Sequence, residues 1–348
     1  MNNPRHIKVG AIDVGYGHTK FVVIQDGKNA VRRFPSLALS VNAEEEALGY
    51  LSTKSDLRKV KVSSEKPPVW VGPAVISRLS GNSNARELSD EYCLSDNYLA
   101  FVRGALTYMN TTQVQVLQLG LPMTTIGNHR AALQRKMTGE HHLIAQNGEV
   151  YTCNVKKVVV VGQPVAAISH YMSQPDAPEL HGNDRVLLID FGYFTTDWVV
   201  MDSNMDIVLD RSGAETGGMN KVVSTIFEGL AKELGRTLPP SILGAIDTAM
   251  SEGKVEVRVR DTMHNFQKHI LATDTHAKSF LNAVSSKVGS VQDVRKIVIC
   301  GGGASFMKRH VLNQFGPEGL VVLDQSQDAI ALGLHFLGSV VARQDVYA

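Results

Sequence analysis

The chain has 348 residues, a length that suggests two domains. Its composition, 43% hydrophobic and 20% charged, is that of a globular protein and excludes a chain that is disordered throughout. The 35 basic and 34 acidic residues leave a net charge of +1, which excludes nucleic-acid binding through bulk positive charge.

Three cysteines (Cys93, Cys153 and Cys300) have no CxxC spacing, which favours a reducing compartment and argues against a zinc site. The N-terminal residues enter a strand-like run without an apolar signal segment. No apolar run reaches the ~20 residues that a membrane span needs. We therefore expect a cytoplasmic protein that does not contact a membrane.

The first half begins with three β-rich runs separated by short turns. The runs cover residues 7–13, 19–25 and 30–34, and the Asp26-Gly27 pair is a strong hairpin signal. These runs predict a three-strand meander. Beyond it, the pattern predicts helices over 96–109, 128–138 and 164–172 and strands over 114–119 and 157–161.

The second half opens in the same way, with runs over residues 186–190, 196–201 and 207–210. Beyond them we expect a helix over 219–234, helical segments between 241 and 288, strands over 296–300 and 320–323, and helices over 305–314 and 327–341. Strands that alternate with helices indicate a mixed sheet that is covered on both faces.

An internal repeat relates the two halves. Residues 12–23 read IDVGYGHTKFVV and residues 189–200 read IDFGYFTTDWVV, and the two segments agree at seven positions without a gap. Their offset of 177 residues is half the chain. The repeat and the similar runs around it predict a duplicated α/β fold with a cleft between the halves.

Residues 37–95 do not fit the repeat and are rich in Ser, Glu and Lys. We interpret them as an insertion lobe on the first domain. The lobe carries a basic run formed by Lys54, Arg58, Lys59 and Lys61. Such a run is either a solvated face or a contact surface for a partner or a neighbouring subunit.

Each copy of the repeat contains a glycine turn that follows an aspartate, Asp13 in the first copy and Asp190 in the second. Glycine lets successive backbone N–H groups point at an anion. Lys20 adds a positive charge to the first turn, and Thr195 and Thr196 add hydroxyl donors to the second. Two carboxylates that face each other suit a hydrated Mg²⁺ bound next to phosphates. The alternative is two ordinary hairpin turns whose aspartates cap local N–H groups. The symmetric pair favours phosphate binding.

A third glycine cluster, Gly301-Gly302-Gly303, follows the strand predicted over 296–300. It permits the close approach of a flat ligand such as a nucleoside, or it is a tight corner without a ligand. Two other nucleotide signatures are missing, because the sequence has neither GxxxxGK[ST] nor the third glycine of GxGxxG after Gly15 and Gly17.

These segments together resemble the actin-like ATPase superfamily, in which two ribonuclease-H-like domains enclose a nucleotide. Five segments are similar to the family's motifs and occur in the family's order: Asp13-x-Gly-x(4)-Lys20, Gln163-Pro164-x-Ala166-Ala167, Asp190-x-Gly-x-x-Thr195-Thr196-Asp197, Gly301-Gly302-Gly303 and Ala329-x-Ala331-x-Gly333. The family resemblance identifies them as the two phosphate motifs, the adenosine motif and the two connecting segments.

Smaller features resemble the filament-forming plasmid-segregation actins of the ParM/StbA group. They are Arg33-Phe34-Pro35-Ser36, Trp70-Val71-Gly72 and Leu119-Gly120-Leu121-Pro122. The second phosphate loop is similar to that of the ParM-like protein D of PRTRC plasmid systems. Two positions differ from the usual family pattern. Phe194 replaces the second glycine of DxGxGTT, and Gln163 stands where many bacterial relatives have Glu. Because Gln orients a water but is a poor general base, we expect slow hydrolysis.

The resemblance implies an α/β actin-like fold with domain I over 1–172, including the lobe at about 37–95, domain II over 173–326, and a C-terminal helix over 327–348 that returns to domain I. It implies ATP or ADP with Mg²⁺ as cofactors. Asp13 and Asp190 would hold the metal through water, and Gln163, Asp190 and Asp13 would act in catalysis. Nucleotide binding is expected for Asp13, Gly15, Tyr16, Gly17, His18, Lys20, Gly192, Tyr193, Phe194, Thr195, Thr196, Gly217, Gly218, Gly301, Gly302, Gly303 and Ala304.

The function implied is a filament-forming ATPase that helps to segregate DNA, with slow hydrolysis driving polymer turnover. Its partners would be further copies of itself and a DNA-binding adaptor protein, without direct DNA binding and without a membrane. A second hypothesis is a non-polymerising, nucleotide-gated scaffold of the same fold, of the cell-division or pilus-assembly type. A sugar or acid kinase would need a substrate-binding acid or base outside the five motifs, and the sequence offers no convincing candidate.

Overall fold

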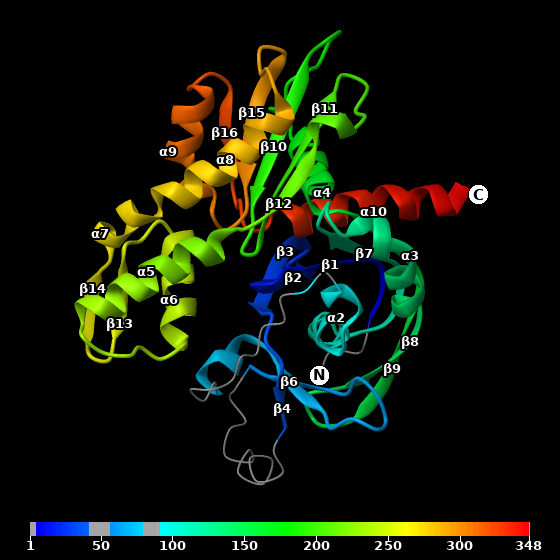
Figure 1. Cartoon of the computed structure of the whole chain (residues 1–348). Helices are drawn as coiled ribbons and strands as arrows, with labels where there is room; N and C mark the ends of the chain where they lie inside the picture. Colours follow the sequence, from blue (N-terminus) through cyan, green and yellow to red (C-terminus); the bar gives the residue numbers. More distant parts are fainter. Residues whose placement is uncertain (1–4, 42–55, 79–88, 90, 348) are drawn as a thin grey trace. The chain divides into compact units, whose positions relative to one another are not determined.

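The computed structural model of the protein describes residues 5–41, 56–78, 89 and 91–347. It divides into two compact units (Figure 1). Unit 1 consists of Met1–Leu121, Thr125–Gly162 and Ala331–Ala348, and unit 2 consists of Pro122–Thr124 and Gln163–Ile330. No helix within the described part of the chain is long and apolar enough to cross a membrane.

Unit 1 is built on a six-stranded sheet of order β3-β2-β1-β7-β9-β8. Its strands are β1 (Arg5–Val14), β2 (His18–Gln25), β3 (Lys28–Pro35), β7 (Thr111–Leu121), β8 (Gly139–Ile144) and β9 (Val150–Gly162). Strands β1, β7 and β9 run parallel, whereas the β1–β2, β2–β3 and β8–β9 pairs are antiparallel. The expected first meander is confirmed. Its second turn has φ of 50° at Asp26 and 75° at Gly27, the left-handed pair that a two-residue hairpin requires.

Helices cover both faces of this sheet. Helix α2 (Asp96–Met109) begins at Ser95, whose side chain accepts a hydrogen bond from the Tyr98 backbone N–H. Together with α3 (Ile126–Met137) it buries the apolar core on the face that carries Ile12. Helix α10 (Ala329–Tyr347) approaches β1 at Val9, which points to the opposite face because strand side chains alternate.

The described part of the insertion lobe forms a small sheet of order β4-β6-β5 with two short 3₁₀ helices. Its elements are β4 (Leu39–Ser40), β5 (Arg58–Val60), β6 (Val69–Val71), η2 (Pro73–Arg78) and η3 (Tyr92–Leu94). The lobe is fastened to α2 at Tyr108, because the guanidinium group of Arg58 in β5 lies 4.1 Å from its ring centroid. The guanidinium group of Arg32, in β3 of the main sheet, lies 5.0 Å from the same centroid. Of the basic run, Arg58 and Lys59 lie on β5, whereas Lys54 is outside the described residues.

Unit 2 repeats the arrangement with a five-stranded sheet of order β12-β11-β10-β15-β16. Its strands are β10 (Arg185–Phe191), β11 (Thr195–Asp202), β12 (Gly213–Thr216), β15 (Val294–Cys300) and β16 (Leu320–Val322). Strands β10, β15 and β16 run parallel, and β10–β11–β12 form the second meander.

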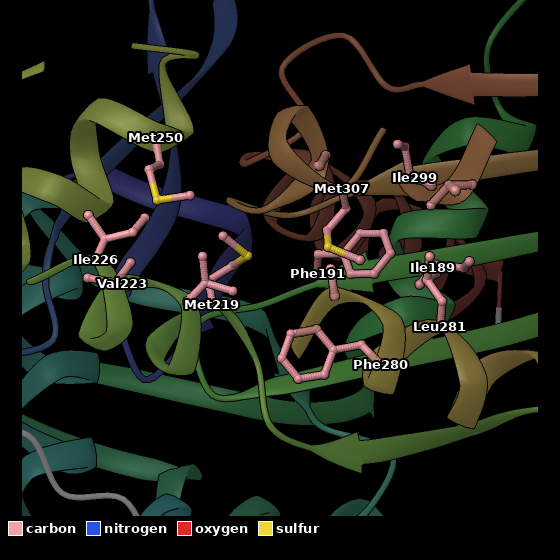
Figure 2. Close-up of a cluster of buried hydrophobic side chains, with 14 of the residues drawn as sticks. Ile189, Phe191, Met219, Val223, Ile226, Met250, Phe280, Leu281, Ile299 and Met307 are labelled. Atoms are coloured by element: carbon pink, nitrogen blue, oxygen red, sulfur yellow. The ribbon is translucent and has the colours of Figure 1, made fainter. Parts of the chain in front are cut away.

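The two faces of the unit 2 sheet carry different helices. Leu187, Ile189 and Phe191 of β10 enter a large apolar core that also contains Met219 and Met307 (Figure 2). Helices α5 (Met219–Glu233), α8 (Asp274–Val288) and α9 (Ala304–Phe315) contribute to this core. Helix α4 (Gln163–Met172) packs on β10 and β11, and its buried alanines are separate from that core. Asp190, an even-numbered residue, therefore points to the face that carries α4.

The third strand of the second meander was predicted at the wrong place. It covers Gly213–Thr216, whereas Ile207 makes only an isolated bridge and Leu209–Arg211 is a 3₁₀ turn. Ser212 explains the shift, because its hydroxyl donates to the Val208 carbonyl and accepts the Val200 backbone N–H. The Ser212 side chain therefore accepts the backbone N–H of β11 that a strand over 207–210 would need for its own hydrogen bonds.

The region expected to be helical between 241 and 288 also contains a hairpin. Its elements are α6 (Ser241–Ser251), β13 (Glu256–Val259), β14 (Thr262–Asn265), α7 (Gln267–Ile270), η5 (Leu271–Thr273) and α8. The hairpin packs on α6, and α5 lies beside α6 (Figure 1). The turn of this hairpin contains Arg260 with a φ of 55°. Glycine and asparagine are the usual signals for such a left-handed turn residue, so that an arginine there did not indicate a hairpin. Strand β8 was likewise not predicted.

Candidate functional site

The first glycine turn joins β1 to β2 in unit 1. The Gly15 backbone N–H donates to the His18 carbonyl at 3.1 Å and closes the turn. Asp13, which is opposite Lys20 in the strand register, has a side chain that is only 1% exposed. The Lys20 ammonium lies 3.4 Å from Asp13 Oδ2 and is 15% exposed. The loop thus brings a buried carboxylate and a partly accessible cation to the end of one strand pair.

Ser36, the residue directly after strand β3, holds this turn in place. Its hydroxyl donates to the Gly15 carbonyl at 2.6 Å, and its backbone N–H donates to the Gly17 carbonyl at 3.0 Å. Because the single hydroxyl proton is used in this way, the Thr19 hydroxyl is the donor in the 3.0 Å bond to Ser36 Oγ. Tyr16 is fixed separately, since its hydroxyl donates to the Ser89 carbonyl at 3.1 Å.

The second glycine turn joins β10 to β11 in unit 2. It is closed by a bond of 3.0 Å from the Gly192 N–H to the Thr195 carbonyl. The segment that leads into α5 lies directly on it, because the N–H groups of Met219 and Asn220 donate to the carbonyls of Gly192 and Tyr193. Gly218 makes this approach possible. A Cβ there would stand 2.5 Å from the Gly192 carbonyl oxygen.

The threonines of the second turn make contacts inside the protein. Thr196 is fully buried, and its hydroxyl donates to the Gly217 carbonyl at 3.2 Å. The Thr195 side chain lies close enough to the Asp197 carboxyl to lower its pKa. Phe194, which replaces a family glycine, accepts the Gly217 N–H at its carbonyl at 3.0 Å. The Thr196 hydroxyl therefore braces the loop, and the contact of either threonine with phosphate stays a prediction.

The third glycine cluster follows β15 and leads into α9. The Gly303 N–H donates to the Phe191 carbonyl at 3.0 Å, and the Gly301 N–H donates to the Ser326 carbonyl at 2.9 Å. Ala304 is the first residue of α9. The cluster is therefore bonded to the end of β10, directly after Asp190, and unit 2 brings these two predicted site segments together.

Asp197 is a site residue to which the sequence interpretation gave no role of its own. It pairs with Asp190 in the antiparallel register of β10 and β11, and it is fully buried. Its Oδ1 accepts the Met123 backbone N–H at 2.9 Å. Burial raises the pKa of the Asp197 carboxyl to about 6, although the Thr195 and Met123 hydrogen bonds lower it. The strand alternation of DFGYFTTD, which places Asp190 and Asp197 side by side, is the signal that could have found it.

Two actin-like families match the sequence. The N-terminal domain family of actin-like proteins matches residues 11–165. The C-terminal domain family of MreB-like archaeal actin homologues matches residues 188–313. The chain belongs to the actin-like superfamily. The first matched segment contains the Asp13 turn and Gln163, and the second contains the Asp190 turn and Gly301-Gly302-Gly303.

Solved actin-like structures share the fold of this chain. The archaeal actin homologue Ta0583 in complex with ADP has a TM-score of 0.75 and 20% identity over 96% of this chain and 100% of its own. A ParM from Clostridium botulinum, in a 15-stranded filament, has a TM-score of 0.77 and 19% sequence identity, over 97% of this chain and 100% of its own. The actin-like protein Alp7A has a TM-score of 0.74 and 15% sequence identity, over 99% of this chain and 99% of its own. A search of curated proteins finds no match. The predicted α/β actin-like fold is confirmed.

Gln163 is the first residue of α4 in this actin-like chain and is 7% exposed. It directly follows Gly162, the last residue of β9. Because α4 packs on the face of β10 to which Asp190 points, the helix begins on the side of the sheet that carries this carboxylate. No group of three His, Cys, Asp or Glu in the described ranges could hold a metal ion directly. Asp13 and Asp190 stay the candidates for a metal bound through water.

Proposed function

We propose that this actin-like chain binds and slowly hydrolyses ATP, assembles into filaments and acts in the segregation of plasmid or other DNA. The observation that carries the proposal is the pair of turns after β1 and β10. Each turn is closed by one backbone hydrogen bond and follows a buried aspartate, Asp13 in unit 1 and Asp190 in unit 2. Plain hairpin turns do not require a buried carboxylate at the same position twice.

The residues at these turns fit the phosphates of a nucleotide and a magnesium ion. Asp13 and Asp190 supply hard oxygen donors, and Lys20 supplies a positive charge at the first turn. When bound, magnesium would supply positive charge that offsets the charge of the phosphates. Gly15, Gly17 and Gly192 have no Cβ, so that the backbone at these three positions can come close to an anion.

We assign the chemical step to water positioning rather than to a strong base. Gln163 would hold the attacking water with its amide, and an amide cannot accept a full proton at neutral pH. We assign the base end of the nucleotide to Gly301, Gly302, Gly303 and Ala304. An archaeal actin homologue of the same fold has been solved with ADP, which supports this choice of ligand.

The assembly part of the proposal rests on the ParM structures that share this fold, one of which is a filament. Copies of the chain would be its first partner. Because the net charge is +1, a DNA-binding adaptor protein fits better than direct DNA binding. We place the protein in the cytoplasm, where ATP and plasmid DNA are both present.

The test combines sedimentation, electron microscopy and phosphate release on the purified chain. With Mg²⁺ and ATP we expect filaments in the pellet and slow release of phosphate, and with EDTA we expect neither. Nucleotide binding without polymer at any concentration would favour the nucleotide-gated scaffold instead. A chain that binds no nucleotide would overturn the proposal.

A further inference from the structure

The Asp190 carboxylate is held by the end of the neighbouring strand β15. Asp190 and Cys300 are partners in the parallel register, so that their side chains point to the same face. The Cys300 thiol donates to Asp190 Oδ1 with an S···O distance of 3.7 Å. Cys300 is fully buried and Asp190 is 5% exposed, so that water competes little for this contact.

The residue after Cys300 touches the same oxygen. A Cβ at Gly301 would stand 2.3 Å from Asp190 Oδ1 and 2.6 Å from the Phe191 carbonyl oxygen. Gly301 also has φ of 88°, and its N–H is bonded to the Ser326 carbonyl. The backbone at Gly301 therefore forms a wall against Oδ1 that no other residue type could form without displacing the carboxylate.

The second oxygen of the carboxylate lies on the other side. A Cβ built on Gly192 would stand 3.9 Å from Asp190 Oδ2 and 3.9 Å from Thr195 Oγ1. Oδ2 is thus directed towards the turn between β10 and β11. Oδ1 is therefore the carboxylate oxygen on the β15 side, and Oδ2 is the oxygen on the side of the turn.

We propose that Cys300 and Gly301 are positioning residues for Asp190, which hold Oδ1 so that Oδ2 is presented to the metal and phosphate at the second turn. The inference rests on the proposed function and deepens it. Gly301 belongs to the segment predicted to bind adenosine, and together with Cys300 it contacts Asp190, the carboxylate predicted to bind the metal. A thiol suits this position. It is a weak donor and leaves most of the negative charge on the carboxylate.

The first experiment measures the Mg²⁺ concentration for half-maximal phosphate release. Cys300→Ala removes the donor, and we expect the Mg²⁺ requirement to rise about 3- to 10-fold, which is the range of one weak hydrogen bond. Nucleotide binding in EDTA and the melting temperature of the nucleotide-free protein should stay close to wild type. Cys300→Ser keeps a donor and should restore most of the Mg²⁺ response.

The matched control is Cys153→Ala, which empties a similar volume at a fully buried cysteine of β9 in unit 1. It should not change the Mg²⁺ requirement. An unchanged requirement in Cys300→Ala, or an equal change in Cys153→Ala, would overturn the positioning role.

The second experiment does not depend on nucleotide. The infrared difference spectrum of wild type minus Cys300→Ser isolates the S–H stretching band of Cys300. We expect this band at lower frequency with Asp190 than in the same difference taken on an Asp190→Asn background, because a carboxylate is the stronger acceptor. Equal bands would overturn the inference even if ATP is hydrolysed. A shifted band in a protein that binds no nucleotide would support the contact and refute the proposed function.

Discussion

The Asp197 carboxylate accepts a hydrogen bond of 2.9 Å from the backbone N–H of Met123, a residue 74 positions away in the sequence. Met123 belongs to Pro122–Thr124, which follows the last residue of β7 but is part of unit 2. The bond fastens this short segment to β11. Because Asp197 is fully buried, its charge state affects the free energy of unfolding.

The first prediction concerns pH. The pKa of Asp197 rises from 3.8 to about 6 in the folded chain, so that the folded state binds more protons than the unfolded state between these values. The protonated Asp197 carboxyl contributes its full amount to the free energy of unfolding below pH 3.8. This contribution, up to about 3 kcal/mol, is lost as the pH rises to about 6. Asp197→Asn keeps an acceptor for Met123 and removes the charge. We expect it to melt at a higher temperature than wild type at pH 8, with a smaller difference at pH 4.5.

Melting curves of the nucleotide-free protein in EDTA at both pH values check this. Asp261→Asn, at the exposed tip of the β13–β14 hairpin, is the control, and its melting temperature should equal that of wild type at both pH values. If Asp197→Asn differs from wild type by the same amount at pH 4.5 and pH 8, Asp197 does not titrate in this range.

The second prediction concerns magnesium. Asp190→Ala removes the carboxylate that we assign to the metal, and we expect Mg²⁺-dependent phosphate release to fall to background. The matched variant Asp261→Ala should keep its turnover. Titration of each variant with Mg²⁺ at fixed ATP makes the comparison. Wild-type turnover in Asp190→Ala would mean that the second turn is a plain hairpin.

The third prediction concerns the support of the first turn. Ser36→Ala leaves the Gly15 carbonyl without the hydroxyl that donates to it at 2.6 Å. Because the Gly15 carbonyl is only partly buried, the loss of this hydrogen bond costs about 1 kcal/mol, and we expect urea unfolding to show a loss of this size. ATP binding should weaken at the same time, because the turn loses its support. Ser203→Ala, whose hydroxyl donates to Gly182 in an exposed turn, should change neither quantity. Unaltered ATP affinity in Ser36→Ala would separate the turn from nucleotide binding.

The fourth prediction concerns the lobe. We assign its basic run to a contact between subunits. Deleting 54–66 would also remove Leu57 and Val60, which are buried in the lobe and in the unit 1 core, so that reversal of one exposed charge is the cleaner test. Lys61→Glu should raise the critical concentration for assembly at least about threefold and leave monomer nucleotide binding unchanged. Lys287→Glu, on the exposed side of α8, is the control. Equal critical concentrations for wild type and Lys61→Glu would make the run a solvated face.

Much of the fold could be predicted because its signals are local. The strands β1 and β10 each contain an apolar run that leads to an aspartate, and the hairpin at Asp26-Gly27 has the residues its turn requires. The repeat then predicted that the halves share one architecture. The third strand of unit 2 could not be placed, because Ser212 decides it through contacts with Val200 and Val208.

The site was predictable as segments and not as contacts. Asp190 and Gly301 could be singled out from motifs, but the contact between them depends on the register of β10 against β15, which are separated by more than a hundred residues. The hydrogen bond from Ser36 to Gly15 depends in the same way on the pairing of β3 with β2. Sequence patterns predict which strands form but carry little information about which side chains face each other across them.

The last prediction separates nucleotide binding from chemistry. Gln163 begins α4 directly after β9, with Pro164 in the first turn of the helix, where a missing N–H costs nothing. Gln163→Ala should leave ATP affinity and filament formation close to wild type. Phosphate release should fall about 10- to 1,000-fold if the amide positions the attacking water, and filaments should persist longer after ATP is added. Gln174→Ala, beyond the other end of the same helix, is the matched control, since its amide donates to His170 of that helix. Phosphate release recorded together with light scattering decides between this role and simple packing at the helix start, because packing alone predicts unchanged release and an unchanged filament lifetime.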